Sequence, residues 1–387
     1  MVFNIFIREW KRIASLPAHY IVLLVMPPFL FFFFALIYQN HHAKDLPVAV
    51  WDEDGSALSR QLTYMLEETP SIHIIRQVSD RQELERDFRA GKVFGAIHFP
   101  KGFERDVKSN HPVNVTLYTN SAAVVPAKLI YKDAARVIIT GGSGVTLQKL
   151  VKKGMPEGAA MALVQPIRLT TYALYNPSYN YQQYLAPGLI TVALQMMVIM
   201  ISVLLLNYEW KTDTIAELIQ MAGGASWRVV VGKTLAHLTV SWVNFVLITA
   251  IVFPYFGLSH PGTTAAFFLL YSLLVLACIG FGILVSALFR DVMLSSDIAL
   301  FYTSPAFVFS GYTFPRWAMP WYDRVYAYLM PYTPFLDGFF KVYFMGLPLR
   351  YALPEIGVLL LFIGLTFPLG IYIFQRKINP YRYAALS

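Results

Sequence analysis

The sequence predicts a polytopic α-helical membrane protein with six transmembrane helices and an inserted extracytoplasmic α/β domain. Of its 387 residues, 56% are hydrophobic and only 14% are charged, whereas soluble proteins average roughly 25% charged residues. The charge is uneven, because residues 39–183 hold 17 basic and 14 acidic side chains and the rest of the chain holds far fewer. Six apolar stretches also approach the roughly 20 residues that a helix needs to cross a bilayer.

The elements are expected in a simple order along the chain. The expected parts are an interfacial amphipathic helix at 1–15, a first transmembrane helix at 16–38, the extracytoplasmic domain at 39–183, and five further spans within 184–387. The apolar stretches that predict the spans are 19–38, 184–206, 234–253, 265–288, 292–310 and 355–374. A loop at 207–233 and an aromatic segment at 311–351 connect spans within the last part.

The first residues have an apolar stripe at helical spacing, with basic residues off that stripe. This pattern is typical of a helix lying in the surface of the lipid bilayer, and the alternative is a frayed tail. The stripe is Phe3, Phe6, Ile7 and Trp10, and the basic residues are Arg8, Lys11 and Arg12.

The first apolar stretch follows basic residues, as the core of a signal peptide would. It is longer than such a core and lacks a small-residue cleavage site, so we expect a retained span. Pro27 and Pro28 lie in its middle and predict a kink, because proline removes a backbone donor.

The distribution of lysine and arginine in short loops predicts the orientation, since cytoplasmic loops carry the excess. With the N-terminus inside, the short cytoplasmic segments hold ten basic residues and the outer loops hold four. Both termini are therefore expected in the cytoplasm and residues 39–183 outside.

The insert is predicted to be a small mixed sheet with helices on one face, because strand-like and helical patterns alternate. Expected strands are 47–51, 72–78, 93–99, 113–119 and 167–174, and expected helices are 57–68, 80–90 and 127–139. Four residues rich in glycine, 141–144, are expected to break the helical region that follows.

Gly232-Lys233-Thr234 matches the end of a phosphate-binding loop. The motif also needs a glycine five positions before Gly232, where this chain has Trp227, and it needs a preceding strand. We therefore expect no nucleotide site in this chain, and if the protein uses ATP, a partner subunit would bind it with its Mg²⁺.

Two acidic features have both a functional and a structural interpretation. Asp52, Glu53 and Asp54 could hold a cation at a strand end, or Asp54 or Ser56 could cap the next helix. Asp297 is the one acid well inside a span, which favours proton relay or substrate contact, or else a hydrogen bond to a neighbouring helix.

The loop at 207–233 mixes charges with a short helical pattern, which favours a docking element for a cytosolic partner over a solvated linker. The segment at 311–351 is rich in aromatic residues and broken by Pro315, Pro320, Pro331 and Pro334. It predicts short helices dipping into the outer leaflet, or an ordinary aromatic belt.

Other chemistry is not indicated. Motifs of serine hydrolases, zinc proteases and CxxC redox proteins are absent, and no basic run of five suggests a nucleic-acid partner. The single cysteine, Cys278, is expected to be a packing residue.

The whole layout, together with four local patterns, resembles the permease subunits of type-2 ABC exporters, in the subgroup with a large extracytoplasmic domain between spans one and two. The patterns are 48–54 with Leu58-Ser59-Arg60; 214–218 with Trp227 and Gly232-Lys233; 286–290; and Ser310-Gly311-Tyr312-Thr313-Phe314-Pro315 with Met319-Pro320 and Pro331-Tyr332-Thr333. The chain departs from the family at Asp213, where glycine is usual, and at 221–224, where the family has Thr-Pro.

The resemblance implies a six-span half that pairs with a second copy or a paralogue and with a cytosolic ABC ATPase in the bacterial inner membrane. It implies that the ATPase acts through the loop and the interfacial helix, and that a drug, lipid or glycolipid-like substrate leaves beneath the re-entrant aromatic segment. A periplasmic adaptor is a further implied partner. The implied coupling residues are Glu209, Lys211, Asp213, Thr214, Glu217, Leu218, Trp227 and Lys233, and the implied pathway residues are Ser310, Gly311, Phe314, Pro315, Pro320 and Pro331.

Two other classes remain as alternatives. A proton-coupled secondary transporter would need several intramembrane acids or bases and an internal repeat, whereas Asp297 stands alone in the sequence. A membrane-anchored sensor or binding protein would not need six spans.

Overall fold

The computed structural model describes residues 1–37, 44–167, 172, 174–175, 181–257 and 262–384. The chain divides into two compact units, which we call the helical unit (Met1–His41 with Ala173–Ser387) and the α/β unit (His42–Tyr172). The α/β unit thus lies within the insert expected at 39–183.

The α/β unit contains a mixed four-stranded sheet with the strand order β2-β1-β3-β4. Strand β1 (Leu46–Asp52) pairs in parallel with β2 (Ile72–Gln77) and β3 (Gly95–Phe99), and β4 (Thr116–Thr119) pairs antiparallel with β3. The strand expected at 167–174 falls largely outside the described residues, and its described members, Ile167, Tyr172 and Leu174, are not in a strand.

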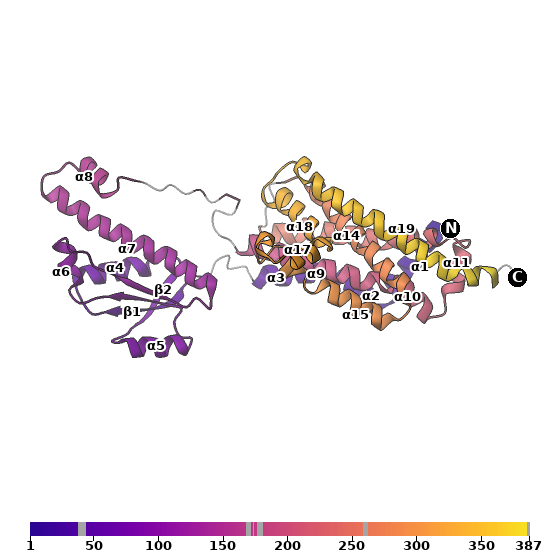
Figure 1. Ribbon diagram of the computed structural model, residues 1–387, viewed down its shortest axis with the longest axis horizontal. Coiled ribbons are helices and arrows are strands. Elements are labelled where there is room, and N and C mark those ends of the chain that lie inside the picture. The colour runs from indigo at the N-terminus through magenta and orange to yellow at the C-terminus, as the bar shows by residue number, and fades with distance from the viewer. Residues whose placement is uncertain (38–43, 168–171, 173, 176–180, 258–261, 385–387) are drawn as a thin grey trace. The chain divides into compact units, whose positions relative to one another are not determined.

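Helices cover both faces of this sheet, not one face as expected. In Figure 1, α4 (Ala57–Glu67) and α7 (Val124–Lys152) lie on one side and α5 (Arg81–Arg89) on the other. Val48 and Val50 join the cluster beneath α4 and α7, while Ala49 and Ala96 join Leu84 of α5. Parallel strands buried on both faces are the rule, because crossover helices pack against each face.

Helix α7 runs unbroken through the glycine-rich residues 141–144, so the expected break is wrong. A Cβ atom at Gly141 would lie 2.3 Å from Leu62 Cδ2. Glycine therefore lets α4 approach α7, and this packing outweighs its low helix propensity of about 1 kcal/mol relative to alanine. Two short helices complete the unit, α6 (Phe103–Lys108) and α8 (Glu157–Val164).

The acids at the end of β1 are engaged in the fold. Asp52 accepts hydrogen bonds from the Asp54 and Gly55 amides, and Asp54 accepts from the Gly102 amide at 2.8 Å and the Glu104 amide at 3.0 Å. Ser56 caps α4 by accepting from the Ser59 amide. Of the two caps expected for this helix, Asp54 and Ser56, the structure has Ser56.

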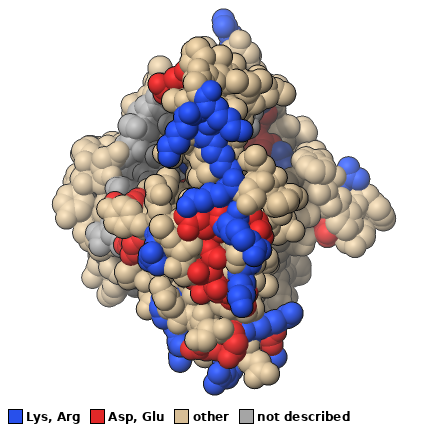
Figure 2. Space-filling view, turned by 90° about the vertical axis from the view of Figure 1, so that its left-hand side faces the viewer, with Lys and Arg blue, Asp and Glu red and all other residues tan. Residues whose placement is uncertain are grey.

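Acidic and basic side chains adjoin one another on the face of the molecule shown in Figure 2. On α6, Lys108 pairs with Glu104 at 2.7 Å and Arg105 with Asp106 at 2.9 Å.

The helical unit has five helices long and apolar enough to cross a membrane within the described residues. They are Leu185–Lys211, Ser226–Tyr255, Thr264–Leu288, Val292–Phe309 and Leu349–Asn379. These spans consist of α9 (Tyr181–Ser202) with α10 (Leu204–Lys211), α12 (Ser226–Leu247) with η2 (Ile248–Val252) and α13 (Phe253–Tyr255), α14 (Thr264–Leu288), α15 (Val292–Thr303) with α16 (Ala306–Phe309), and η5 (Leu349–Ala352) with α19 (Leu353–Ala384).

The first expected span corresponds to a shorter apolar helix, Ile21–Ile37. It begins with a π-helical turn, η1 (Ile21–Val25), which follows α2 (Pro17–Tyr20) and leads into α3 (Met26–Ile37). Pro27 is the second residue after this turn, and local π-helical adjustments can satisfy the backbone groups that a proline frees in a membrane helix.

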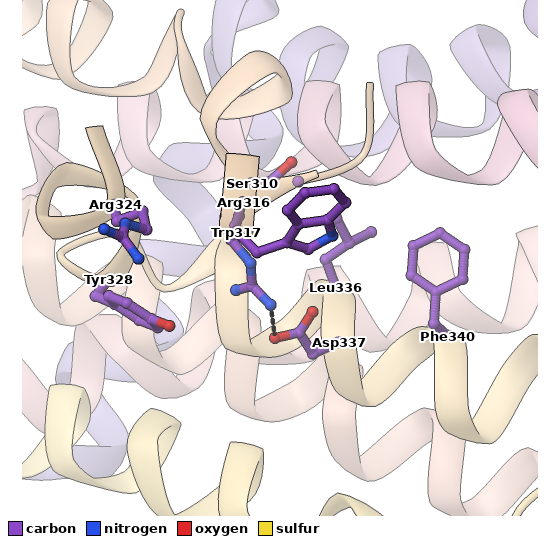
Figure 3. A pocket seen from close by; sticks show the side chains of 9 residues that line it. Ser310, Arg316, Trp317, Arg324, Tyr328, Leu336, Asp337 and Phe340 are labelled. Carbon is purple, nitrogen blue, oxygen red and sulfur yellow. Dashed lines mark hydrogen bonds and ion pairs between the residues drawn. The ribbon is translucent and has the colours of Figure 1, made fainter. Parts of the chain in front are cut away.

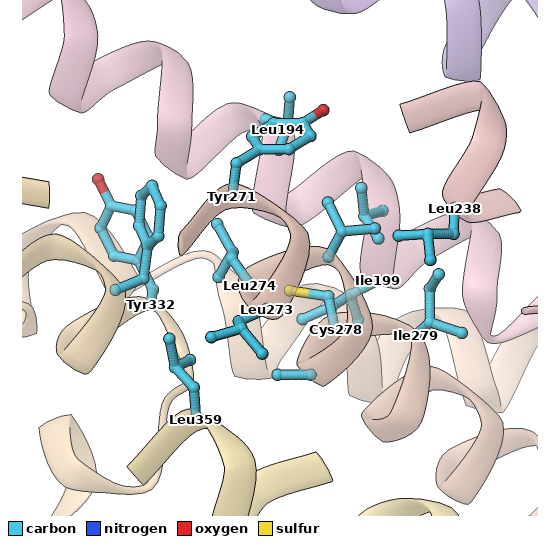
Figure 4. Packing of buried hydrophobic residues seen from close by; sticks show 14 of the residues in the cluster. Leu194, Ile199, Leu238, Tyr271, Leu273, Leu274, Cys278, Ile279, Tyr332 and Leu359 are labelled. Carbon is cyan, nitrogen blue, oxygen red and sulfur yellow. The ribbon is translucent and has the colours of Figure 1, made fainter. Parts of the chain in front are cut away.

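Helix α14 forms the centre of the helical unit and is surrounded by α9, α12, α18 (Tyr332–Phe339) and α19. Figure 4 shows its residues Tyr271, Leu274 and Cys278 among apolar side chains of these neighbours. Cys278 is fully buried, as expected for a packing residue.

Two connecting segments of the helical unit form short helices. Helix α11 (Ile215–Met221) lies between α10 and α12, near α1 (Val2–Ser15) and the end of α19 (Figure 1). The aromatic segment forms η3 (Arg316–Ala318), α17 (Trp321–Tyr328), α18 and η4 (Phe340–Phe344). The prediction of short helices in this segment is therefore correct.

Candidate functional site

Helix α1 packs directly on α12, the helix that carries Lys233. A Cβ atom at Gly232 would lie 2.8 Å from Ile5 Cβ and 3.0 Å from the Val2 carbonyl oxygen, so only glycine permits this approach. The face of α1 that becomes buried is Ile5, Glu9 and Ile13.

A network of buried charged side chains joins α1 and α12 near this contact. Lys233 Nζ is 2.7 Å from Glu9 Oε2 and 2.6 Å from Glu209 Oε1, so it joins α1, α12 and α10. All three side chains are 1% exposed. His237 Nε2, one turn further along α12, is 3.1 Å from Glu9 Oε1.

Two arginines of α1 complete the network. Arg8 donates to both carboxylate oxygens of Glu209, each at 2.9 Å, and bidentate pairs of this kind are among the strongest in proteins. Arg12 contacts both Glu9 and Glu209. Thr214, at the start of α11, donates to Glu209 Oε2 at 2.6 Å, so this one carboxylate touches α1, α11 and α12. We call Arg8, Glu9, Arg12, Glu209, Lys233 and His237 the charge network.

The neighbouring cations determine the ionisation of Glu9. Burial alone would raise the pKa of this carboxyl group, but Lys233 and Arg12 outweigh it and hold the pKa well below its usual range. The carboxylate therefore stays charged. Removing one partner of a buried ion pair leaves an uncompensated charge and typically costs about 3–5 kcal/mol.

The predicted coupling residues separate into a buried and an exposed group. Glu209, Leu218 and Lys233 are buried, and Thr214 is half-buried. Helices α10 and α12 extend beyond the expected spans, which places Glu209 and Lys233 in helices, not in the loop. The exposed group, which we call the α11 surface, consists of Lys211, Asp213, Glu217 and Trp227.

Two of the six predicted pathway residues, Ser310 and Gly311, line a pocket in the aromatic segment, and the other four do not. This pocket of about 420 Å³ includes Ser310, Gly311, Arg316, Arg324 and Asp337 in its lining (Figure 3). Pro315, Pro320 and Pro331 precede η3, α17 and α18 as N-caps, while Phe314 is exposed. Proline is favoured near helix starts because it has no N–H to leave unsatisfied.

Asp297 lies exposed on α15 and makes no hydrogen bond or ion pair with the described residues. The hydrogen bond expected as its structural explanation is thus not found. Ser295 is the residue that contacts a neighbouring helix, accepting from Asn207 Nδ2 at 2.7 Å.

Comparison with known proteins identifies the family. The family model described as ABC-2 family transporter protein matches residues 19–372. The chain belongs to this family. Two relatives from Escherichia coli strain K12 are named probable multidrug ABC transporter permease YbhR and YbhS. Each is 22% identical, over 86% of this chain and of YbhR, and over 93% of this chain and 94% of YbhS.

As an ABC-2 transporter, the chain is a multi-pass membrane permease, and membership implies that it works with an ATPase subunit. The Gly232-Lys233-Thr234 motif lies inside α12, where the Lys233 amine is occupied by two carboxylates.

Sequence reasoning missed two members of the charge network in this ABC-2 permease, Glu9 and His237. Phe3 and Ile7 of the predicted apolar stripe are exposed on α1, while Glu9 lies on a different face and is buried. A signal was present, because Glu9 is an acid between two arginines on an apolar helix, and Lys233 and His237 are one turn apart on another.

Proposed function

We propose that this chain is the membrane subunit of an ATP-driven exporter, energised by a separate cytosolic ABC ATPase that binds ATP and Mg²⁺ and docks on the α11 surface. The observation that carries this proposal is the contact from Thr214 to Glu209. It connects the short helix beneath the exposed residues to the charge network, and through the network to two other helices.

Movement of α11 would be transmitted because the charge network resists stretching. Glu209 contacts Thr214, Arg8 and Lys233 at 2.6–2.9 Å, and separating any of these pairs would expose a buried charge to an apolar surrounding. A displacement of α11 therefore displaces α1 and α12 with it. Closure of the ATPase thereby changes the packing of the helical unit.

The export pathway is proposed to lie between this chain and a second copy or a paralogue. Two spans offer open surface for that partner, since only 22% of the apolar window of Val292–Phe309 and 17% of that of Leu349–Asn379 are buried. Large exposed apolar groups on α15 include Met293 and Phe301. An amphipathic or hydrophobic substrate, such as a drug, lipid or glycolipid, suits such surfaces, and an adaptor protein would complete the assembly outside.

Reconstitution with the ATPase tests the docking surface. Glu217→Lys should abolish copurification of the ATPase and the stimulation of ATP hydrolysis by substrate, because it reverses an exposed charge on α11. Glu157→Lys, the same change on the exposed surface of α8, is the matched control and should behave as wild type. Transport at the normal rate without the ATPase would contradict the proposal.

The proposed location is the bacterial inner membrane, with both termini in the cytoplasm. Because Cys278 is buried, single added cysteines can be labelled in the native background. Gln82→Cys on α5 should react with a membrane-impermeant maleimide in whole cells, and Gln220→Cys on α11 only after permeabilisation. The reverse pattern would invert the topology.

A further inference from the structure

The pocket in the aromatic segment is lined by arginine side chains whose positive charge is only partly paired with acids of the described chain. It is a cavity of about 420 Å³ lined by residues that include the turn after α16, η3, α17 and α18. In Figure 3, Arg316 and Trp317 lie in the middle of the view, with Arg324 and Tyr328 on one side and Asp337 on the other.

Only part of the positive charge is neutralised within the chain. Arg316 Nη2 donates to Asp337 Oδ2 at 2.5 Å, while Arg316 Nη1 is buried with no hydrogen-bond partner among the described residues. Arg324 is exposed and pairs with no acid in the described part of the chain. Two arginines and one aspartate leave the pocket with a formal charge of +1.

Arginine side chains that lack an acidic partner are suited to binding anionic ligands. The planar guanidinium group binds phosphate and carboxylate oxygens through paired N–H donors, and a buried donor without a partner is costly until an acceptor arrives. Trp317 and Tyr328 at the rim are largely exposed aromatic rings, which favour contact with the apolar part of an amphiphile.

We propose that this pocket binds the anionic head of an amphiphile, a phosphodiester with a single negative charge, through Arg324 and the free Nη1 of Arg316. The charge of the head matches the formal +1 of the lining, and the pocket volume limits the fit to the head while the apolar tail lies against the aromatic rim. The inference rests on the proposed function in one respect: it assumes that the ligand of this permease is lipid-like.

Direct binding to the purified full chain in neutral detergent tests this proposal. Isothermal titration calorimetry would compare dihexanoyl phosphatidylglycerol, which carries one negative charge, with dihexanoyl phosphatidylcholine, which has the same chains and no net charge. We expect the anionic lipid to bind more tightly. Arg324→Gln should weaken its binding about tenfold, because a charge-assisted hydrogen bond is lost.

Arg350→Gln is the matched control, because Arg350 is also an exposed arginine and lies outside the pocket; it should bind as wild type does. Competition with glycerophosphoglycerol, the same phosphodiester head without acyl chains, separates the sources. Its failure to displace the lipid at equal concentration supports an amphiphile, and Arg324-dependent displacement would replace the amphiphile by a soluble phosphodiester and overturn that part of the proposal. Equal binding of both lipids, or of Arg324→Gln and Arg350→Gln, would overturn the proposal. No ATPase is present, so failure here leaves ATP-driven export untouched.

Discussion

Two groups of charges in the helical unit differ in how completely they are satisfied. The charge network on α1, α10 and α12 is closed: Glu9, Glu209 and Lys233 are 1% exposed, and each makes several polar contacts. The pocket is open: the Arg316–Asp337 pair has side chains 23% and 33% exposed, and Arg324 pairs with no described acid. The first arrangement holds helices together, and the second leaves charge available to a ligand.

The comparison teaches that burial alone does not mark a site of recognition in a membrane protein. A buried charge that has its partners stabilises one packing of helices, whereas an incompletely paired charge beside a cavity favours binding. The two arrangements therefore predict different results for the same kind of substitution.

The largest expected effect is on stability in the charge network. Lys233→Met removes the cation between two carboxylates and should lower the free energy of unfolding by about 3–5 kcal/mol, measured by thermal unfolding in detergent. Lys211 is the last residue of α10 and its side chain is exposed. The control variant Lys211→Met should therefore change the free energy of unfolding little.

A double variant separates lost charge balance from lost packing. Glu9→Gln added to Lys233→Met should restore part of the stability, because it removes a buried carboxylate that has lost one of its two cations, and a double-mutant cycle measures that coupling. A double variant that loses the full sum of both single effects would show that the network is not coupled.

The network illustrates what a single sequence could and could not predict. The pattern around 207–233 indicated a functional segment, but Glu209 and Lys233 looked like surface charges because their partners on α1, Arg8 and Glu9, are more than 200 residues distant in sequence. Helical periodicity predicted α1 and its apolar stripe, to which the exposed Phe3 and Ile7 belong, but no local pattern showed that Glu9 on another face would be buried against α12.

A smaller effect is expected from pH, again in the network. A carboxyl group whose pKa is lower in the folded state stabilises the fold above its unfolded pKa, and that contribution is lost as pH falls through the folded pKa. The Glu9 pKa lies well below its ordinary value of 4.5. The stability difference between wild type and Glu9→Gln should therefore be constant from pH 8 to about 5.5 and shrink only below about pH 4.5.

The same difference shrinking between pH 7 and 6 would contradict this interpretation, because it would mean that Glu9 titrates near neutrality. Measuring wild type and variant in parallel cancels the titration of groups that do not contact Glu9. Because His237 contacts Glu9 at 3.1 Å, both measurements are repeated in a His237→Gln background, which removes the imidazole.

The α/β unit was more predictable than the helical unit for a physical reason. Strand patterns, the Ser56 cap and the helices of this unit depend on residues close in sequence, so β1, β2, α4 and α5 lie within one or two residues of their expected bounds. The continuous course of α7 depends on Gly141 meeting Leu62, and no local pattern encodes a contact across that distance.

The smallest stability effect is expected in the pocket, where it is accompanied by a gain in binding. Asp337→Asn removes the acid from a pair that solvent partly screens, so the loss of stability should be about 1 kcal/mol or less. The formal charge of the lining rises from +1 to +2 and Arg316 is released, so an anionic lipid should bind more tightly, and added salt should weaken that gain. Asp323→Asn, the same change at a nearby acid with no ion pair in the described chain, should alter neither quantity. Asp337→Asn could instead lose as much stability as Lys233→Met does, with no gain in lipid binding. Arg316 and Asp337 would then form a structural ion pair like those of the charge network. The distinction between the closed charge network and the open pocket would fail.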